Sequence, residues 1–320
     1  MKVAVVYSEV KREYFPTETQ YLTEKDALND AKVIATYVKN MGNTPLLFPG
    51  DAQLAENLNN TNPGLVINLV GSVRGKEYLS AAIPGLLEIL DLPFTGARFM
   101  GEALSFNKYL ILKLLEKNDV PVARYQLIVD YREPLKTTLR FPLISKLNEI
   151  HGAVEIDQDA VSENEDHLRK RLKKLIATYR QPILVQEFIP GREITGIFFE
   201  GLGQEVFLAE KKFSSPDKKF VFATFEHQWL DREETFHYQK YHDDKLNHFI
   251  RKAFFAAKMA DYGKFDVRLN PAGEYFFIDA NSNPAFGPKE LQCALGTILD
   301  MYGVSFEEIL KVLLAKHQKK

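Results

Sequence analysis

Short apolar runs and longer segments with an apolar stripe alternate along the first hundred residues. Apolar runs bounded by polar or turn-forming residues are typical of buried strands, and apolar residues at every third or fourth position predict amphipathic helices. The pattern predicts strands at Val3–Tyr7, Pro45–Phe48, Leu65–Val70 and Pro93–Thr95, and helices at Glu24–Asn40 and Glu77–Leu90. Strands that alternate with helices indicate an open parallel sheet.

The rest of the chain mixes helices with strands of alternating pattern. A long helix is predicted over Arg98–Lys117 and ends before Pro121. Further helices are predicted at Glu163–Tyr179, Asp243–Tyr262, Leu291–Tyr302 and Ser305–Ala315. Pro182–Phe188 predicts a buried strand, and Ile194–Phe199, Glu205–Lys211 and Phe220–Phe225 predict strands of an antiparallel sheet. Ser214–Lys219 predicts a polar loop and Lys316–Lys320 a frayed tail.

Two alternating segments, Phe265–Leu269 and Tyr275–Ala280, flank a short connection with Pro and Gly, which predicts a β-hairpin. Asp266 lies near the start of the first strand, and Asp279 and Asn281 lie at the end of the second. An antiparallel pairing brings these positions close together. Two carboxylates and an amide oxygen suit Mg²⁺ shared with nucleotide phosphates. The alternative is that these residues only cap a strand and begin a polar loop.

Composition narrows the class of protein. A chain of 320 residues with 45% apolar residues can bury a full core and divide into two or three subdomains. The net charge of −2 and the pI near 6.4 argue against a general binder of nucleic acid or membrane surfaces. No window approaches the roughly 18 apolar residues that a membrane span needs. We expect a soluble, cytoplasmic protein with no nucleic-acid or membrane partner.

Cysteine and histidine usage points to no metal cluster. The single Cys293 excludes an internal disulfide framework and fits a buried helix position in a reducing compartment. His237, His242 and His248 have spacings that fit no zinc ligand set, so we expect them to be surface or core residues.

The hairpin sequence, D-x-R-L-N, a turn and F-I-D-A-N-S-N-P, resembles the metal-binding hairpin of ATP-grasp carboxylate–amine ligases, especially the D-alanine–D-alanine ligase branch. That family pattern reads R-x-D-x-x, a turn and L-E-x-N-x-x-P, so Lys264 replaces an Arg and Asp279 replaces a Glu. The resemblance implies that Asp266, Asp279 and Asn281 bind Mg²⁺ or Mn²⁺. It also gives Lys264 the task of stabilising a tetrahedral oxyanion.

Two lysines resemble the phosphate ligands of the same family. Asn107-Lys108 resembles the start of its D-K-x-x-x-K signature, and F-P-L-I-S-K, ending at Lys146, resembles F-P-[VL]-[IV]-V-K-P. The resemblance implies that Lys108 and Lys146 reach the phosphates of ATP, where a lysine acts as a compact point charge. The alternative is that both are solvated surface lysines.

The stretch Q-E-F-I-P-G-R-E-I-T, beginning at Gln186, resembles the hinge that holds adenosine in the family. The resemblance implies that backbone groups around Glu187, Phe188 and Ile189 bind the adenine edge beside Gln186. It also implies that Glu193 accepts hydrogen bonds from the ribose hydroxyls. The alternative is an ordinary surface strand.

The resemblance spans nearly the whole chain and implies an ATP-grasp fold of the α/β (α+β) class. We expect an N-terminal open parallel-sheet domain at residues 1–97, a central lid domain at 98–188 and a C-terminal antiparallel-sheet domain with the metal site at 189–320. Such enzymes use ATP and Mg²⁺ to phosphorylate a carboxylate, and an amine attacks the acylphosphate to give an amide or peptide bond. The partners are then a small-molecule carboxylate and amine, and homodimers are the habit of the family.

The loops that contact substrate depart from the family pattern. Gly71–Gly75 replaces the H-G-x-x-G-E-D-G loop, the early Glu of E-R-E-V-S is absent, and only Gly152 remains of the E-G-S-S-x-G lid. Where the family usually shows P-G-x-T-x-x-S, with a Ser that helps to bind the acceptor carboxylate, this chain has Pro284–Glu290, and Glu290 would repel a carboxylate. We therefore expect a ligase whose acceptor is not D-alanine. Two alternatives are an ATP-grasp kinase of a small metabolite and an inactive ATP-binding regulatory protein.

Overall fold

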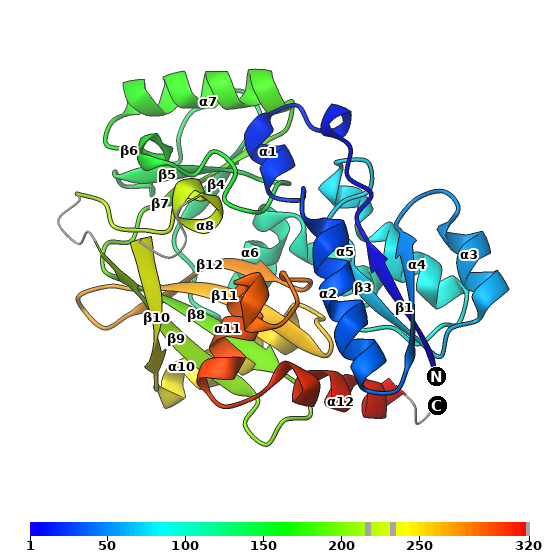
Figure 1. Cartoon of the computed structure of the whole chain (residues 1–320). Helices are drawn as coiled ribbons and strands as arrows, with labels where there is room; N and C mark the ends of the chain where they lie inside the picture. Colours follow the sequence, from blue (N-terminus) through cyan, green and yellow to red (C-terminus); the bar gives the residue numbers. More distant parts are fainter. Residues whose placement is uncertain (215–218, 231–234, 318–320) are drawn as a thin grey trace.

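The computed structural model describes residues 1–214, 219–230 and 235–317. Three sheets make up the frame, and Figure 1 shows the parallel one beside two antiparallel ones. Most of the loop expected at Ser214–Lys219, and the end of the tail expected at Lys316–Lys320, lie outside the described residues. None of the described helices combines the length and apolar character that a membrane span requires.

The N-terminal sheet is parallel, as expected, with the order β2 (Thr44–Pro49), β1 (Lys2–Tyr7), β3 (Leu65–Leu69). Side chains of β1 alternate between two cores: Val3 and Val5 pack with α2 (Ala27–Asn40), and Ala4 and Val6 pack with α3 (Leu54–Thr61) and α4 (Ala82–Ile89). The single helix predicted over Glu77–Leu90 is wrong. A 3₁₀ turn, η2 (Glu77–Leu79), precedes α4, because Glu77 and Ser80 turn inward to bind partners on other elements.

The helix predicted over Arg98–Lys117 is also wrong, because it is two helices, α5 (Phe99–Ser105) and α6 (Lys108–Lys117). Asn107 has an extended backbone, and its side chain caps α6 by accepting a hydrogen bond from the backbone N–H of Leu110. Asparagine is among the preferred N-cap residues, since its oxygen satisfies an otherwise unpaired N–H. The break makes Lys108 the first residue of α6.

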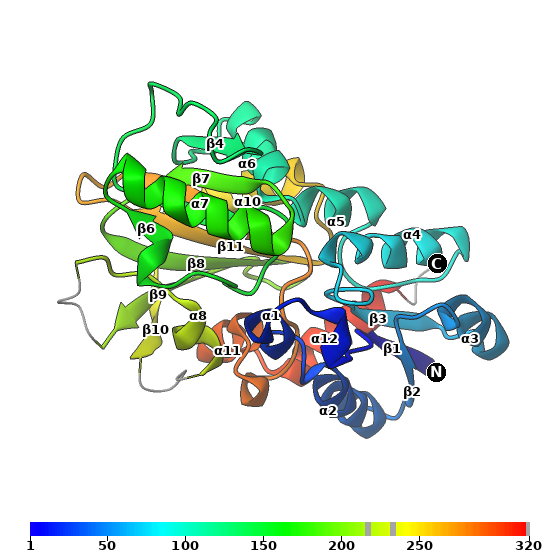
Figure 2. The same cartoon turned by 90° about the horizontal axis from the view of Figure 1, so that it is seen from above.

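The central sheet is antiparallel, with the order β4 (Tyr125–Ile128), β7 (Ile183–Glu187), β5 (Leu143–Leu147), β6 (Val161–Ser162). Helix α7 (Glu165–Tyr179) covers it with Leu168, Leu172 and Leu175, and Figure 2 shows this helix lying across the strands. The helix begins two residues later than predicted, at an N-cap formed by Asn164.

The C-terminal sheet is antiparallel, with the order β10 (Phe236–Tyr241), β9 (Val206–Phe213), β8 (Arg192–Phe199), β11 (Tyr262–Leu269), β12 (Tyr275–Asn281). The helices α10 (Asp244–Ala256), α11 (Ala294–Met301) and α12 (Phe306–His317) complete this part. Cys293 is buried as expected, although it caps α11 at its N-terminus and lies outside the helix itself.

Two predicted elements of this region are wrong. Residues 220–224 form no strand, and Phe225 begins the short helix α8 (Phe225–Trp229). Their backbone groups bind side chains instead of a neighbouring strand: Ala223 N donates to Glu193, and Val221 O accepts from Arg268. The helix predicted over Asp243–Tyr262 ends at Ala256, because Lys258 and Asp261 adopt left-handed backbone conformations before β11 begins.

Candidate active site

A cavity of about 1280 Å³ lies between the three sheets, and its walls come from all of them. Every residue that the sequence nominated for nucleotide, metal or catalysis lines it: Lys108, Lys146, Gln186, Glu187, Phe188, Ile189, Glu193, Lys264, Asp266, Asp279 and Asn281. The predicted residues that lie farthest apart in the chain, Lys108 and Asn281, are separated by 173 positions and still line the same cavity. A concave site with converging polar groups is the default candidate for a functional site.

The hairpin β11–β12 brings its acidic residues together through a β-bulge. Leu269 pairs with Tyr275 and Val267 with Phe277, but the register then shifts, and Asp266 pairs with Asp279. A regular ladder would have placed Ile278 opposite Asp266 and turned Asp279 to the other face, since strand side chains alternate. Bulges of this kind re-aim side chains beside active sites. The extra residue, Ile278, leaves its carbonyl to accept a hydrogen bond from Lys146 Nζ at 3.2 Å.

Asp266 lies at the centre of a buried cluster of charges. Lys264 Nζ forms an ion pair with Asp266 Oδ2, Thr195 Oγ1 donates to Oδ1 at 2.9 Å, and Lys211 Nζ lies 3.5 Å from Oδ1. Burial by itself raises the pKa of Asp266, but the charges of Lys211 and Lys264 outweigh it and hold the pKa below its usual range. The carboxylate is therefore ionised, and two ammonium groups already compensate it.

Glu193 joins the same network from β8. Its Oε1 accepts a hydrogen bond from Lys211 Nζ at 2.6 Å, and its Oε2 accepts from Arg268 Nη1 at 3.2 Å and from Ala223 N at 3.2 Å. All three charged side chains are about 4% exposed. Both oxygens of Glu193 are thus engaged within the chain, so the residue has a structural role in addition to any contact with a ribose.

We expect the Glu193→Gln variant to lose about 2 kcal/mol of unfolding free energy, because buried Arg268 loses its charged partner and buried Lys211 keeps only Asp266. Chemical denaturation of the nucleotide-free protein measures this. Glu205→Gln is the matched control, since Glu205 pairs with Arg251 at the surface and such pairs contribute about 0.5 kcal/mol. Equal stability of the two variants would contradict a supporting role for Glu193.

Lys146 projects from β5 into the cavity. Its Nζ donates to Gln186 Oε1 and to Ile278 O, both at 3.2 Å. Burial lowers the pKa of Lys146 to about 8, although the charge of Asp279 acts in the opposite direction. This arrangement orients the Gln186 amide, whose Nε2 is buried and has no hydrogen-bond partner within the described part of the chain. Gln186 lines the cavity, so this donor is left for a bound molecule.

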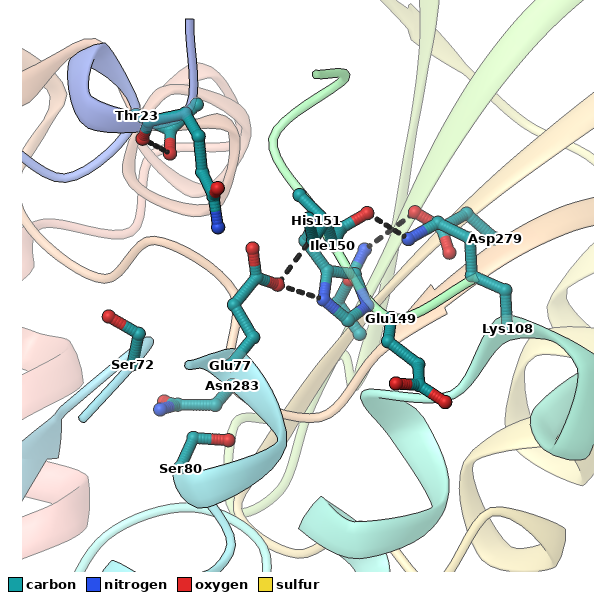
Figure 3. Close-up of polar contacts among 12 residues, drawn as sticks. Thr23, Ser72, Glu77, Ser80, Lys108, Glu149, Ile150, His151, Asp279 and Asn283 are labelled. Atoms are coloured by element: carbon teal, nitrogen blue, oxygen red, sulfur yellow. Dashed lines mark hydrogen bonds and ion pairs between the residues drawn. The ribbon is translucent and has the colours of Figure 1, made fainter. Parts of the chain in front are cut away.

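Lys108 lies at the start of α6, buried, with its Nζ donating to Ile150 O at 2.7 Å. Burial lowers the pKa of Lys108, and the charges of Asp279 and Glu77 partly oppose the shift. The lysine is therefore not the solvated surface charge of the alternative interpretation. The hydrogen bond links α6 to the loop after β5, and Figure 3 shows Lys108 beside Asp279.

Of the two carboxylates on the hairpin, Asp279 has fewer direct partners than Asp266. Its Oδ2 accepts a hydrogen bond from Asn281 Nδ2 at 3.4 Å, and its Oδ1 is buried without a partner among the described residues. Burial raises the pKa of Asp279, but the charges of Lys108 and Lys264 oppose it, and the pKa is lowered. A buried, ionised oxygen without a partner beside an amide fits a hard divalent cation. No group of three or more His, Cys, Asp or Glu side chains suited to a metal occurs within the described ranges, so phosphate oxygens would have to complete such a site.

Three carboxylates that line the cavity, Glu24, Glu77 and Glu102, were not predicted from the sequence, and we call them the N-terminal wall. Glu77 pairs with His151 at 2.8 Å, Ser72 Oγ donates to Glu24 at 2.7 Å, and Glu102 accepts from Ser80 Oγ at 2.9 Å. Burial raises the pKa of Glu24 to about 7 and raises that of Glu102. All of these residues except Ser72 line the cavity. Their contacts span 22 to 74 residues, so no local motif reveals them.

Comparison with known proteins places this site in a family. A family model described as D-ala D-ala ligase C-terminus matches residues 114–315, more than half of the chain. The protein therefore belongs to the D-alanine–D-alanine ligase family of ATP-grasp proteins, of which it is a divergent member.

The individual relatives are distant. The chain is 27% identical over 269 residues to the uncharacterized protein y4sG of Sinorhizobium fredii (strain NBRC 101917 / NGR234), covering 79% of this chain and 78% of that one. It is 22% identical over 293 residues to the D-alanine–D-alanine ligase of Wolbachia pipientis wMel, covering 90% and 88%. Sequence identity at this level leaves room for a different substrate.

Solved structures share the fold. The D-alanine–D-alanine ligase of Bacillus anthracis complexed with ATP aligns with a TM-score of 0.74 at 14% identity, covering 99% of this chain and 97% of that one. The VanG D-Ala:D-Ser ligase of Enterococcus faecalis aligns with a TM-score of 0.72 at 14% identity, covering 99% of both. The expected ATP-grasp fold, with one parallel and two antiparallel sheets, is therefore confirmed.

Proposed function

We propose that the protein is an ATP- and Mg²⁺-dependent ligase that joins a carboxylate to an amine through an acylphosphate. The observation that carries the proposal is the single cavity in which two buried lysines face the ionised residues of the β11–β12 hairpin. Buried lysines with a lowered pKa bind anions well, because a nearby negative charge stabilises the ammonium form that burial disfavours. A triphosphate is an anion of the required size and charge.

Each predicted side chain has a task in this proposal. Lys146 and Lys108 bind the phosphates, and Lys146 gives up its contacts with Gln186 and Ile278 to do so. Asp279 and Asn281, with Asp266 beside them, would hold the divalent cation, which offsets charge on the phosphates when bound. The backbone of residues 187–189 and the free Gln186 amide bind the base. The proposed division into domains at 1–97, 98–188 and 189–320 places ATP between the second and third.

The relatives whose names state a substrate use D-alanine or D-serine as acceptor, and we propose a different acceptor here. Glu24, Glu77 and Glu102 give this part of the cavity wall an acidic character, and Glu290 also lines the cavity. Burial and the neighbouring charge of Glu77 already raise the pKa of Glu24, so a further negative charge is unfavourable here; this disfavours an acceptor that presents its own carboxylate and favours an amine without one. Turnover with D-alanine alone that equals or exceeds turnover with a panel of amino acids and amines would contradict this.

The test of the proposed function is ADP release from Mg²⁺-ATP with pooled carboxylates and pooled amines. The pools contain amino acids of both hands, dipeptides and simple diamines. Release that needs one member of each pool, together with an amide product seen by mass spectrometry, supports the ligase. A stable phosphorylated metabolite would instead indicate a kinase, and no binding of ATP would overturn the proposal.

We expect the Lys264→Ala variant to lose turnover more than affinity for ATP. Lys264 pairs with Asp266 and lines the cavity, and in this proposal it stabilises the negative charge that develops in the tetrahedral intermediate. Loss of one such donor lowers kcat about 100-fold. Steady-state kinetics and calorimetric ATP titration separate the two effects, and a defect confined to ATP affinity would refute the role of Lys264.

A further inference from the structure

A buried carboxylate of the N-terminal wall holds a histidine of the loop after β5. Glu77 Oε2 accepts a hydrogen bond from the backbone N–H of His151 at 2.7 Å and lies 2.8 Å from its Nδ1. Figure 3 shows the His151 ring between Glu77 on one side and Lys108 with Asp279 on the other. The residues are 74 positions apart, and neither had a role in the sequence interpretation.

This contact selects one form of the histidine ring. The Glu77 side chain is 8% exposed, and an ionised carboxylate only accepts hydrogen bonds. The Nδ1 atom therefore carries the proton in the neutral ring, and Nε2 keeps its lone pair. Nε2 is buried and has no hydrogen-bond partner among the described residues. A carboxylate, an oriented imidazole and an unengaged second nitrogen are the parts of a positioned general base.

The loop that carries His151 is fixed from several sides. Asn148 accepts hydrogen bonds from the backbone of Lys108 and Tyr109 at the start of α6, at 3.0 and 2.9 Å. Trp229 Nε1 donates to Gly152 O at 2.7 Å. Gly152 has a left-handed backbone, and a Cβ there would lie 2.8 Å from Thr23. A loop anchored in this way holds His151 at a constant position, which catalysis requires.

The charged groups around His151 are mostly carboxylates. Glu77 on η2 contacts the ring, and the carboxylates of Glu102 on α5 and Asp279 on β12 interact with it electrostatically. Lys108 on α6 is the opposing charge, and it is bound to the neighbouring Ile150 carbonyl. His151, Glu77, Glu102 and Asp279 all line the cavity. The imidazole thus lies between Glu77 on one side and Lys108 with Asp279 on the other, and under the proposed function the two substrates meet there.

We propose that His151 is the general base of the ligation step and that Glu77 is its positioning residue; this rests on the proposed ligase function. The amine enters as an ammonium ion, and one N–H proton passes to Nε2 of His151, which frees the nitrogen lone pair. The nitrogen then forms a bond to the acyl carbon of the acylphosphate, a second N–H proton passes to the departing phosphate, and the bond between the acyl carbon and the phosphate oxygen breaks. Phosphate leaves with that electron pair, and the amide remains.

The test compares two nucleophiles with the same acylphosphate. Hydroxylamine is largely uncharged at neutral pH and attacks without prior deprotonation. An alkyl amine is an ammonium ion at this pH and must first lose a proton. With the carboxylate identified from the ADP-release assay, His151→Gln is expected to form hydroxamate at a rate close to that of the wild type. Its rate of amide formation is expected to fall about 100-fold or more. His248→Gln, at an exposed position on α10 outside the cavity, is the matched control and should keep both rates.

The outcomes separate this inference from the proposed function. Equal loss of both rates in His151→Gln would overturn the base while the ligase stands. Absence of hydroxamate and amide in the wild type, with every carboxylate tried, would overturn both proposals.

A structural readout tests the role of Glu77 without turnover. Nitrogen-15 NMR of the full chain, with His151 identified from the His151→Gln spectrum, should find the tautomer protonated on Nδ1. Glu77→Gln keeps an acceptor but loses its charge, so amide formation should fall about 10-fold. The tautomer protonated on Nε2 in the wild type would overturn the arrangement.

Discussion

The Asp279→Asn variant is expected to release ADP about a thousandfold more slowly than the wild type, equivalent to about 4 kcal/mol. The change keeps the size of the side chain and removes its charge. In the structure Asp279 Oδ1 is buried without a partner among the described residues, whereas Asp266 already has two lysines beside it. The cation that offsets phosphate charge therefore depends more on Asp279 than on Asp266.

Thermal unfolding with and without Mg²⁺-ATP separates loss of function from loss of fold. The variant should unfold within a few degrees of the wild type without nucleotide and should lose the stabilisation that Mg²⁺-ATP provides. Asp119→Asn is the matched control, because the Asp119 side chain is 92% exposed and lies outside the cavity. Addition of EDTA should lower the rate of ADP release by the wild type to that of Asp279→Asn. Normal ADP release by the variant would contradict Asp279 as a metal ligand.

The hairpin shows how far the sequence alone could go. Alternation and turn residues predicted both strands, which extend from Tyr262 to Leu269 and from Tyr275 to Asn281. The convergence of Asp266 with Asp279 depends on a register shift that alternation cannot reveal. The extra residue, Ile278, looks like any other strand residue in the sequence. It becomes recognisable only when its carbonyl meets Lys146, 132 positions away.

The errors in secondary structure have a common physical cause. The break before Lys108, the 3₁₀ turn at Glu77 and the missing strand at 220–225 all occur where backbone or side chain binds a group from a distant element. Local propensity gives no information about such partners. Asn107 was the one local signal, since asparagine before an apolar stripe is typical of a helix start. These places line or border the cavity, where function competes with regular structure.

Keeping the Lys146 side chain buried and protonated lowers the stability of the folded protein. Its pKa is about 8 in the folded protein and about 10.4 in the unfolded chain, so between these pH values only the unfolded chain holds the proton. Raising the pH across this window therefore favours the folded state, by about 3 kcal/mol in total. Below pH 8 both states are protonated, and the full penalty is present. Denaturation of the nucleotide-free protein from pH 7 to 10.5 should record this rise in stability.

Lys146→Met should lose the part of that rise that comes from Lys146, because methionine has no proton to release, while Lys108, whose pKa burial also lowers, still contributes. The same variant should lose about a thousandfold in kcat/KM for ATP, since a buried positive charge facing the phosphates is gone. Lys245→Met, at an exposed position on α10, should change neither property. ATP raises the pKa of Lys146 when its phosphates approach, so calorimetry at pH 8.5 should find proton uptake on binding in the wild type. A pH profile of stability that is the same in Lys146→Met and wild type would show that the lysine is charged at no cost, and would remove the reason to expect an anion beside it.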